Sequence, residues 1–274
     1  MTRDATVPGI TAADATDLSA LRVGAEAARS RDEPFACLVS ALGHPDLGRR
    51  SLLATGLRPE WSSSDRSARD GGFIAPLRRA AQAAFARGAQ GLLVLVSHEA
   101  VTDLEPVPVH ADWRGLPRVQ LWSADEVRSA LRDPADGGWG APMSPPRLRW
   151  ADDGDPFTVD AQGLQGWHRT AVGQVREAIA AGRLYQLCLT FPVRLAPPDD
   201  PASLFAWLMS RHPVDHGAWI SLPGLELLSA SPERFFALRG RRVSARPMKG
   251  TRRVTPETVE AALRELAASE KDRA

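Results

Sequence analysis

The stretch that most constrains the fold begins at a serine two residues before a Ser-Pro-Glu-Arg motif and reads SASPERFFALRGRRVSARPMKGTRR. It contains two short apolar pieces, Phe235–Leu238 and Arg242–Ala245, separated by a glycine. Short apolar pieces on either side of a glycine are typical of a β-hairpin. Because a hairpin brings its two ends together, we expect Glu233, before the first piece, to lie near Lys249, after the second.

The rest of the chain mixes short strands with helices. Residues 18–31 carry Leu21, Ala25 and Ala28 on one face, which predicts a helix that packs by that face. Further helices are predicted at residues 73–87, 164–181 and 203–211 and after residue 255, and strands at residues 35–40, 51–56, 91–97, 118–122, 185–195, 218–221 and 225–229. The mixture predicts an α/β protein, because each kind of element must bury its apolar face against another.

Two of these helices carry apolar stripes, and we expect the stripe of the last helix to be buried. In the helix predicted at residues 164–181, Trp167 and Ile179 begin and end a stripe with a spacing of four residues. In the last helix, Thr255 is predicted to be the capping residue, and Val259 and Leu263 belong to the stripe.

Composition argues against several classes of function. The net charge of +1 gives no reason to expect nucleic acid or an anionic membrane as a partner. The longest apolar run, Leu92–Val96, is far too short to cross a bilayer, and the N-terminus lacks an apolar signal core, so we expect a cytoplasmic protein. Cys37 and Cys188 lie in strand-like stretches and are predicted to be buried free thiols. The six histidines show no metal-ligand spacing, so no metal site is predicted within the chain.

Four motifs, in order along the chain, resemble those of the chorismate-using enzymes. They are IAAGRLYQL at residues 179–187, SPER at 231–234, PMKGTR at 247–252 and SEKDRA at 269–274. Relatives that make anthranilate, isochorismate or salicylate usually have a small apolar residue where this chain has Lys249. The resemblance is therefore greatest to the large subunits (component I) of aminodeoxychorismate synthases, which act in 4-aminobenzoate and folate biosynthesis.

The resemblance implies antiparallel sheets in an orthogonal β-sandwich with surrounding helices, as in anthranilate synthases. It implies an N-terminal domain over residues 1–145 and the first part of the chorismate-binding catalytic domain over residues 146–274. The helix after residue 255 has no stop signal before Ala274. We therefore expect the catalytic domain to be incomplete, to leave apolar strands uncovered and to be inactive alone, since the family's magnesium ligands would follow Ala274.

The resemblance also implies a reaction in which an amino group from ammonia replaces the C4 hydroxyl of chorismate. Hydroxide leaves poorly, so a general acid must protonate it, and Glu233 matches that residue of the family. Lys249 matches a nucleophile that would hold the ring until ammonia arrives. Gly250 and Thr251 would approach the substrate carboxylate. The implied partners are chorismate and a glutamine amidotransferase subunit that supplies ammonia, with Mg2+ as the cofactor of the complete enzyme.

A second site follows from the same resemblance. In relatives, residues at the end of one strand, before the next strand and at a later turn line a tryptophan pocket. The matching positions here are Ser40, Leu47, Gly48, Arg49, Arg50, Asp215, His216 and Gly217. Relatives often have proline with an aromatic residue at the later turn, where this chain has Asp-His-Gly. The alternative is a serine that ends a strand, followed by a solvated basic turn.

Other functions remain open from the sequence. Without the resemblance, an ion pair between Glu233 and Lys249 that closes a hairpin is the simpler interpretation. The chain could also be an anthranilate synthase component I that happens to carry lysine. A third hypothesis is a non-catalytic remnant or binding module that keeps the tryptophan pocket or the contact with the amidotransferase.

Overall fold

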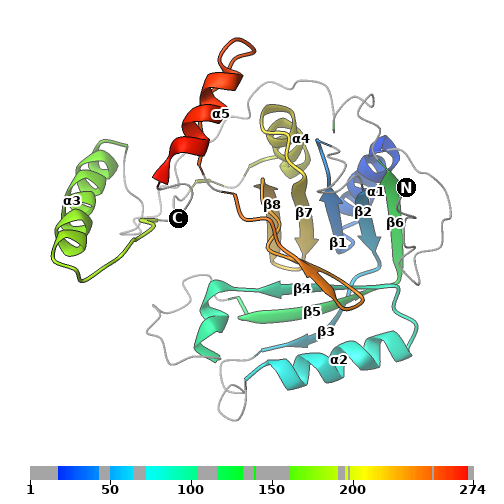
Figure 1. Ribbon diagram of the computed structural model, residues 1–274. Helices are drawn as coiled ribbons and strands as arrows, with labels where there is room; N and C mark the ends of the chain where they lie inside the picture. The colour runs from blue at the N-terminus through cyan, green and yellow to red at the C-terminus, as the bar shows by residue number, and fades with distance from the viewer. Residues whose placement is uncertain are drawn as a thin grey trace. The chain divides into compact units, whose positions relative to one another are not determined.

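The computed structural model describes residues 18–42, 50–63, 72–103, 116–131, 139, 161–190, 195–196, 198–248 and 250–270 (Figure 1). The helices within these ranges are α1 (Leu18–Ser30), α2 (Ile74–Ala86), the 3-10 helix η1 (His98–Asp103), α3 (Ala161–Ala180), α4 (Pro201–Arg211) and α5 (Val259–Ala268). The strands are β1 (Phe35–Val39), β2 (Arg50–Thr55), β3 (Arg58–Ser62), β4 (Gly91–Val96), β5 (Val119–Ala124), β6 (Glu126–Leu131), β7 (His216–Leu222), β8 (Leu225–Ser231), β9 (Ala237–Arg239) and β10 (Arg242–Ser244).

The chain forms two compact units. One comprises residues 1–143 together with residues 208–274, and the other comprises residues 144–207. Every described strand belongs to the first unit, whereas α3 and the beginning of α4 belong to the second. The predicted α/β class with antiparallel sheets is confirmed. The orthogonal crossing of the sheets and the domain division at residue 145 stay predictions.

The largest sheet has five strands in the order β6-β2-β1-β7-β8, and each neighbouring pair is antiparallel. The pairing of β1 with β7 sets Cys37 opposite Trp219, so strands from distant parts of the chain share one sheet. This pairing brings the start of β7 beside the end of β1. Two segments of the predicted tryptophan pocket therefore meet at the same end of the sheet.

Helix α1 packs against β1, β2 and β6. Its buried residues are Leu18, Leu21, Ala25 and Ala28, so the predicted apolar face is confirmed. Beneath it, Phe35 and Trp219 are fully buried and meet edge to face, with ring centroids 4.9 Å apart. Edge-to-face contact is a favoured arrangement of aromatic rings, and here it joins side chains of the neighbouring strands β1 and β7.

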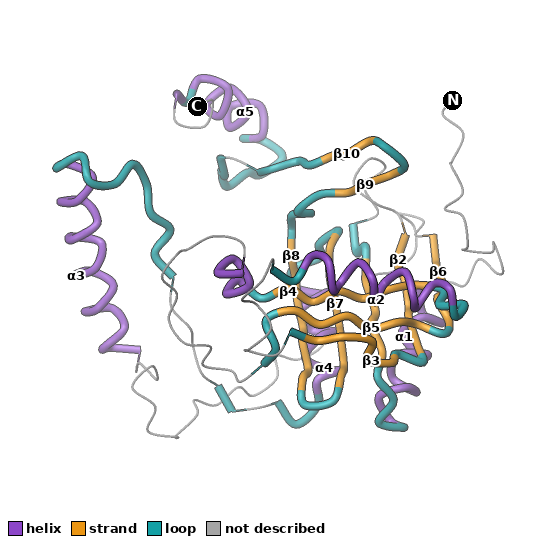
Figure 2. The backbone as a smooth tube through the Cα atoms, turned by 90° about the horizontal axis from the view of Figure 1, so that it is seen from below, coloured by secondary structure: helices purple, strands orange, loops and turns teal. Residues whose placement is uncertain are grey.

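The second sheet has three strands in the order β3-β5-β4. Helix α2 packs against β3 and β5 and lies alongside this sheet in Figures 1 and 2. The two larger sheets share a hydrophobic core. It joins Ala36, Ile220 and Leu222 of the first sheet to Trp122 and Ala124 of β5.

The predicted hairpin is confirmed. Strands β9 and β10 pair antiparallel, with Leu238 opposite Val243, and Gly240 and Arg241 form the turn. Gly240 has a φ of +59°, a left-handed conformation that glycine adopts without steric cost. A two-residue turn with such a residue is typical of a tight hairpin.

Several local predictions are wrong. Residues 185–190 form no strand, and Cys188 is exposed instead of buried. Cys37 is buried as predicted, and burial raises the pKa of its thiol. In α5, the side chain of Leu263, which was predicted to be buried, is exposed. Among the described residues, none of the helices combines the length and apolar character that spanning a membrane needs.

Candidate active site

The loop after β8 holds Glu233 by its backbone. The hydroxyl of Ser231 donates a hydrogen bond to the carbonyl oxygen of Glu233 at 2.9 Å, and the N–H of Glu233 donates back to that hydroxyl at 3.3 Å. Pro232, between them, has a fixed φ, which restricts the loop further. The backbone of Glu233 is thus fixed at the end of β8, while its side chain is exposed to solvent.

Arg234 connects this loop to the hairpin. One of its terminal nitrogens donates to the hydroxyl of Ser244 in β10 at 3.5 Å. The first motif is thereby linked to β10, five residues before the position of Lys249.

The second motif is described on either side of its lysine. Gly250 has a φ of +66°, so the chain turns there in a conformation that disfavours other residues. Beyond it, Arg252 donates to the carbonyl oxygen of Thr251 at 3.0 Å and pairs with Glu265 of α5 at 3.4 Å. Lys249 lies outside the described residues. Its predicted approach to Glu233 therefore stays a prediction.

The predicted tryptophan-pocket residues Ser40 and Asp215 meet in the structure. Both are buried, and the hydroxyl of Ser40 donates to Oδ1 of Asp215 at 3.2 Å. The N–H of Ser40 donates to the hydroxyl of Ser51 at 3.0 Å, and the N–H of Ala41 donates to the carbonyl oxygen of Val214 at 2.7 Å. A buried polar group is costly unless it is hydrogen-bonded, so this cluster holds β1, β2 and the turn before β7 together.

Gly217 is packed closely by Met209 of α4. A Cβ on residue 217 would lie 2.7 Å from Sδ of Met209 and 3.4 Å from the carbonyl oxygen of Val39. Because Met209 is almost fully buried, the space above Gly217 is occupied by a side chain of the protein itself.

His216 lies between the two groups of candidate residues. In the β7–β8 pair it lies opposite Ser231, and Ser231 comes two residues before Glu233 in the sequence. Burial is the main cause that lowers the pKa of His216; the charge of Arg234 lowers it further, and the charge of Asp215 opposes both. The Arg234 side chain therefore acts electrostatically on His216 while it is bonded to the hairpin that follows Glu233.

The remaining pocket positions separate into two groups. Arg50 donates to the hydroxyl of Ser129 in β6 at 2.9 Å, which ties this side chain to the neighbouring strand. Leu47, Gly48 and Arg49 lie outside the described residues.

A hollow lies at the other end of the β7–β8 pair. Its volume is about 380 Å³, and none of the predicted site residues lines it. At its wall, Glu226 accepts hydrogen bonds from the indole of Trp219 at 2.5 Å and from Ser221 at 2.9 Å, and pairs with Arg29 at 3.6 Å. These contacts satisfy a partly buried carboxylate, which is a structural role.

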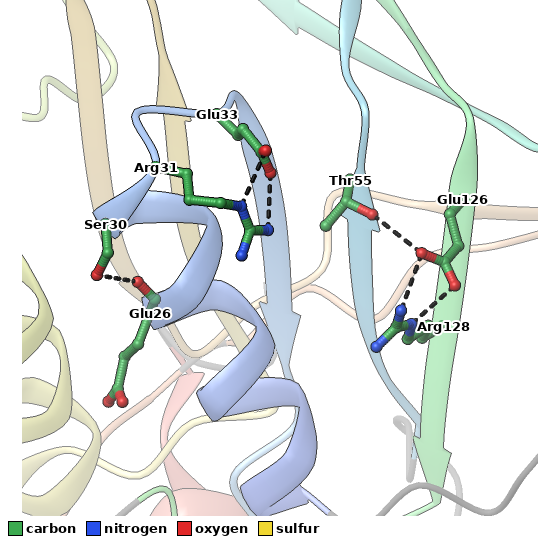
Figure 3. A network of polar contacts seen from close by, with 7 residues as sticks. All are labelled: Glu26, Ser30, Arg31, Glu33, Thr55, Glu126 and Arg128. Carbon is green, nitrogen blue, oxygen red and sulfur yellow. Dashed lines mark hydrogen bonds and ion pairs between the residues drawn. The ribbon is translucent and has the colours of Figure 1, made fainter.

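Two nearby polar groups are surface pairs. Figure 3 shows Arg31 bonded to Glu33 just after α1. It also shows Glu126 of β6 bonded to Arg128 of the same strand and to Thr55 of the neighbouring strand β2. Hydrogen bonding to the arginine lowers the pKa of each glutamate. Exposed pairs of this kind contribute little to stability, and they mark no site.

Sequence reasoning missed Ser51 and Met209, which contact the predicted pocket residues. Ser51 begins the strand pattern of β2, and nothing in that pattern distinguishes it from its neighbours. Met209 belongs to the apolar face of a predicted helix, a pattern that indicates burial but gives no partner. In the described part of the chain, no three His, Cys, Asp or Glu side chains lie together as a metal site would require.

Comparison with known proteins agrees with these motifs. Residues 72–274 match the protein family described as "chorismate binding enzyme". Aminodeoxychorismate synthase of Streptomyces pristinaespiralis is 31% identical over 160 residues, which are 57% of this chain and 21% of that protein. Anthranilate synthase component 1 of Streptomyces coelicolor is 35% identical over 123 residues, or 41% of this chain and 24% of that protein.

A third relative is aminodeoxychorismate synthase component 1 of Bacillus subtilis. It is 29% identical over 121 residues, which are 43% of this chain and 24% of that protein. The matched regions thus span between a fifth and a quarter of the length of these three relatives.

Proposed function

The chain belongs to the family of chorismate binding enzymes, and we propose that it takes part in replacing the C4 hydroxyl of chorismate with an amino group. This is the reaction of the aminodeoxychorismate synthase large subunits that its motifs resemble. The observation that carries the proposal is the β9–β10 hairpin, which joins the loop of Glu233 to the segment that contains Lys249.

The use of lysine in this chain supports a chemical role for Lys249. The chain has 34 lysines and arginines, and only Lys249 and Lys271 are lysines. Arginine is effectively always charged, whereas a lysine amine can become neutral and act as a nucleophile. A chain that uses arginine for all but two of these 34 cations, and has one of its two lysines in this motif, is suited to nucleophilic chemistry there.

The proposed steps balance in atoms and charge. The neutral amine of Lys249 bonds to the ring while the C–O bond at C4 breaks, and Glu233 donates the proton with which the hydroxyl leaves as water. Ammonia then forms the new C–N bond at C4 and displaces the lysine amine, and one proton of the incoming ammonia returns to Glu233, so both groups are restored for another cycle. The backbone at Gly250 and the hydroxyl of Thr251 would contact a carboxylate of the substrate.

Two accessory components are proposed from the same resemblance. Ammonia would come from a glutamine amidotransferase subunit. Mg2+, which supplies a counter-charge for the substrate carboxylates in the complete family enzyme, has no ligand set among the described residues.

The direct test is to trap the covalent intermediate. The purified chain, with the rest of a family catalytic domain supplied as a separate polypeptide, is incubated with chorismate and Mg2+ without ammonia, and its intact mass is measured. We expect an increase equal to chorismate minus one water, mapped by peptide analysis to Lys249. Adding ammonium chloride should discharge the adduct and release aminodeoxychorismate.

The chain provides a matched control. Lys249→Ala should abolish the adduct, whereas Lys271→Ala should leave it in place. For the general acid, Glu233→Gln should slow adduct formation at least a hundredfold, while Glu260→Gln, which changes an exposed carboxylate of α5, should not. An adduct that persists in Lys249→Ala, or a wild-type chain that neither binds nor modifies chorismate, would exclude the proposed chemistry.

The second candidate is anthranilate formation, which the similarity to Streptomyces coelicolor anthranilate synthase component 1 favours. Product analysis separates the two reactions, because aminodeoxychorismate retains the enolpyruvyl group and anthranilate has lost it. Release of anthranilate and pyruvate would reject the first proposal.

We also propose that Ser40 and the turn of Asp215–Gly217 belong to a tryptophan site. The hydrogen bond between Ser40 and Asp215 supports this by bringing the two segments together. Calorimetry with tryptophan tests the idea, and Ser40→Ala should weaken any binding. Heat of binding measured with tryptophan, together with no turnover of chorismate, would favour a binding module over an enzyme.

A further inference from the structure

The side chain of Met209 ends in the space that a side chain at residue 217 would otherwise occupy. A Cβ built on Gly217 would lie 2.7 Å from Sδ and 3.4 Å from Cε of Met209. Met209 is almost fully buried, so the end of its thioether chain is enclosed by the protein. One of the positions predicted to line the tryptophan pocket is therefore filled by the chain itself.

A buried polar pair lies beside this apolar side chain. In the β1–β7 pair, Gly217 lies opposite Val39, the residue before Ser40. Ser40 and Asp215 are both buried, and the hydroxyl of Ser40 donates to Oδ1 of Asp215. A carboxylate is costly to bury, and it is also the group that binds the ammonium of an amino acid by a charge-assisted hydrogen bond. A buried carboxylate next to an apolar space suits a free amino acid with an apolar side chain.

Met209 lies in the last turn of α4, and the chain reaches the polar pair a few residues later. Residues 208–211 belong to the same compact unit as the five-stranded sheet. Residues 211–213 are exposed, whereas Val214 and Asp215 are buried. The buried pair therefore directly follows a turn at the surface.

The side chain that fills the space is of a kind that can leave it. Methionine is unbranched and has three rotatable bonds, so it fills irregular gaps and repacks more easily than branched side chains do. Its thioether is only a weak hydrogen-bond acceptor, so packing rather than a strong polar contact holds it in place. Rotation of this one side chain would open the space beside Gly217 without a change in the sheet.

We propose that Met209 is the gate of the tryptophan site: its side chain closes the space beside Gly217, and an indole ring enters only after that side chain has moved out. This inference rests on the tryptophan site proposed above and adds how that site is regulated. When a site is open in only a fraction of the molecules, its apparent affinity is reduced by that fraction. The closed gate thus sets the concentration of tryptophan to which the chain responds.

The first test measures the binding of L-tryptophan to the full chain by isothermal titration. Met209→Ala opens the space permanently, and we expect it to bind tryptophan at least tenfold more tightly than the wild type. Met209→Leu keeps the space filled with a branched side chain and should bind no more tightly than the wild type. If Met209→Ala does not fold, Met209→Val opens part of the same space and should raise the affinity at least threefold.

The second sheet provides a matched control. Leu121 of β5 is also almost fully buried, so Leu121→Ala opens a cavity of similar size away from the candidate site. This variant should bind tryptophan within twofold of the wild type. Indole-3-propionate, which lacks the ammonium group of tryptophan, controls for apolar binding alone. We expect it to bind Met209→Ala at least tenfold more weakly than tryptophan does.

A second measurement follows the gate itself. The chain has four methionines, and selective 13C labelling of their methyl groups gives each an NMR signal. The signal that disappears in Met209→Leu is that of Met209, and Met248, which is exposed, provides a reference. Adding tryptophan to the wild type should move the Met209 signal toward the reference value, because the side chain leaves the packed interior.

Contrary results separate the gate from the site. Equal tryptophan affinity of the wild type and Met209→Ala, or an unchanged Met209 signal in the tryptophan complex, would overturn the gate but not the tryptophan site. An equal gain of affinity in Leu121→Ala would also overturn the gate. Absence of tryptophan binding in every variant would overturn the site and the gate together. Equal binding of tryptophan and indole-3-propionate to Met209→Ala would identify an ordinary cavity in the core instead of an amino-acid site.

Discussion

The contact between Gly217 and Met209 predicts an effect of Gly217→Ala on stability whose sign depends on whether residue 209 is methionine or alanine. A Cβ added at residue 217 would lie 2.7 Å from Sδ of Met209, whereas an ordinary contact of this kind is about 3.5–4 Å. The sulfur must therefore move by roughly 1 Å. Met209 is 2% exposed, so it must move within a packed interior.

We expect Gly217→Ala to destabilise the protein by about 1–2 kcal/mol, toward the lower end of the usual cost of overpacking, because methionine is flexible. Met209→Ala alone should cost about 2–5 kcal/mol through the lost burial and the cavity. In the Met209→Ala background, the Cβ of an alanine at residue 217 has no sulfur atom to contact. Because the φ of Gly217 is not in the left-handed region, the substitution should then stabilise by about 0.4–1 kcal/mol through the unfolded state.

Urea denaturation of the wild type, both single variants and the double variant completes the cycle. The two substitutions touch, so their effects should fail to add by about 1.5–3 kcal/mol. Additive effects would mean that Met209 does not occupy the space above residue 217. A double variant that gains affinity for tryptophan would show instead that this space is accessible to a ligand once the side chain is removed.

Two further predictions concern the same sheet. Phe35→Ala should destabilise by about 3–5 kcal/mol, because it removes a fully buried ring that meets Trp219 edge to face; urea denaturation measures this, and a loss below about 1 kcal/mol would contradict the packing. Asp215→Asn should lower the pKa of His216 further and Arg234→Gln should raise it, as NMR titration of the imidazole would show; shifts of the same sign would contradict the arrangement. Because the pKa of His216 is lower in the folded state, its contribution to stability is complete above the unfolded value of about 6.5 and is lost as the pH falls through the folded value.

The elements predicted correctly are those whose pattern is local. The face of α1 with Leu21 and Ala25 is buried because an adjacent sheet covers it, and its spacing alone predicts that face. The β9–β10 hairpin forms because Gly240 supplies the turn that the two flanking apolar pieces need. In both cases the sequence contains the signal and its partner within a few residues.

The wrong predictions concern patterns whose partners lie elsewhere. Leu263 has helical spacing and lies in a helix, but spacing does not provide a surface to cover it, and it is exposed. The apolar residues around Cys188 satisfy a strand pattern, yet a strand forms only when another strand pairs with it. Hydrophobic periodicity therefore predicted local conformation better than burial.

The contacts of the candidate sites can also be divided into long-range contacts and local ones. Ser40 and Asp215 are 175 residues apart and meet because β1 pairs with β7, a contact that no local pattern contains. Only the resemblance to a family placed them in one site. In contrast, the proximity of the Glu233 loop to β10 follows from the hairpin itself.

Arg234 shows how these two kinds of contact combine. It follows Glu233 in sequence, donates to Ser244 of β10 and lowers the pKa of His216, so one side chain connects the candidate catalytic loop, the β9–β10 hairpin and the start of β7. The contact with Ser244 follows from the hairpin, whereas the effect on His216 requires the pairing of β7 with β8.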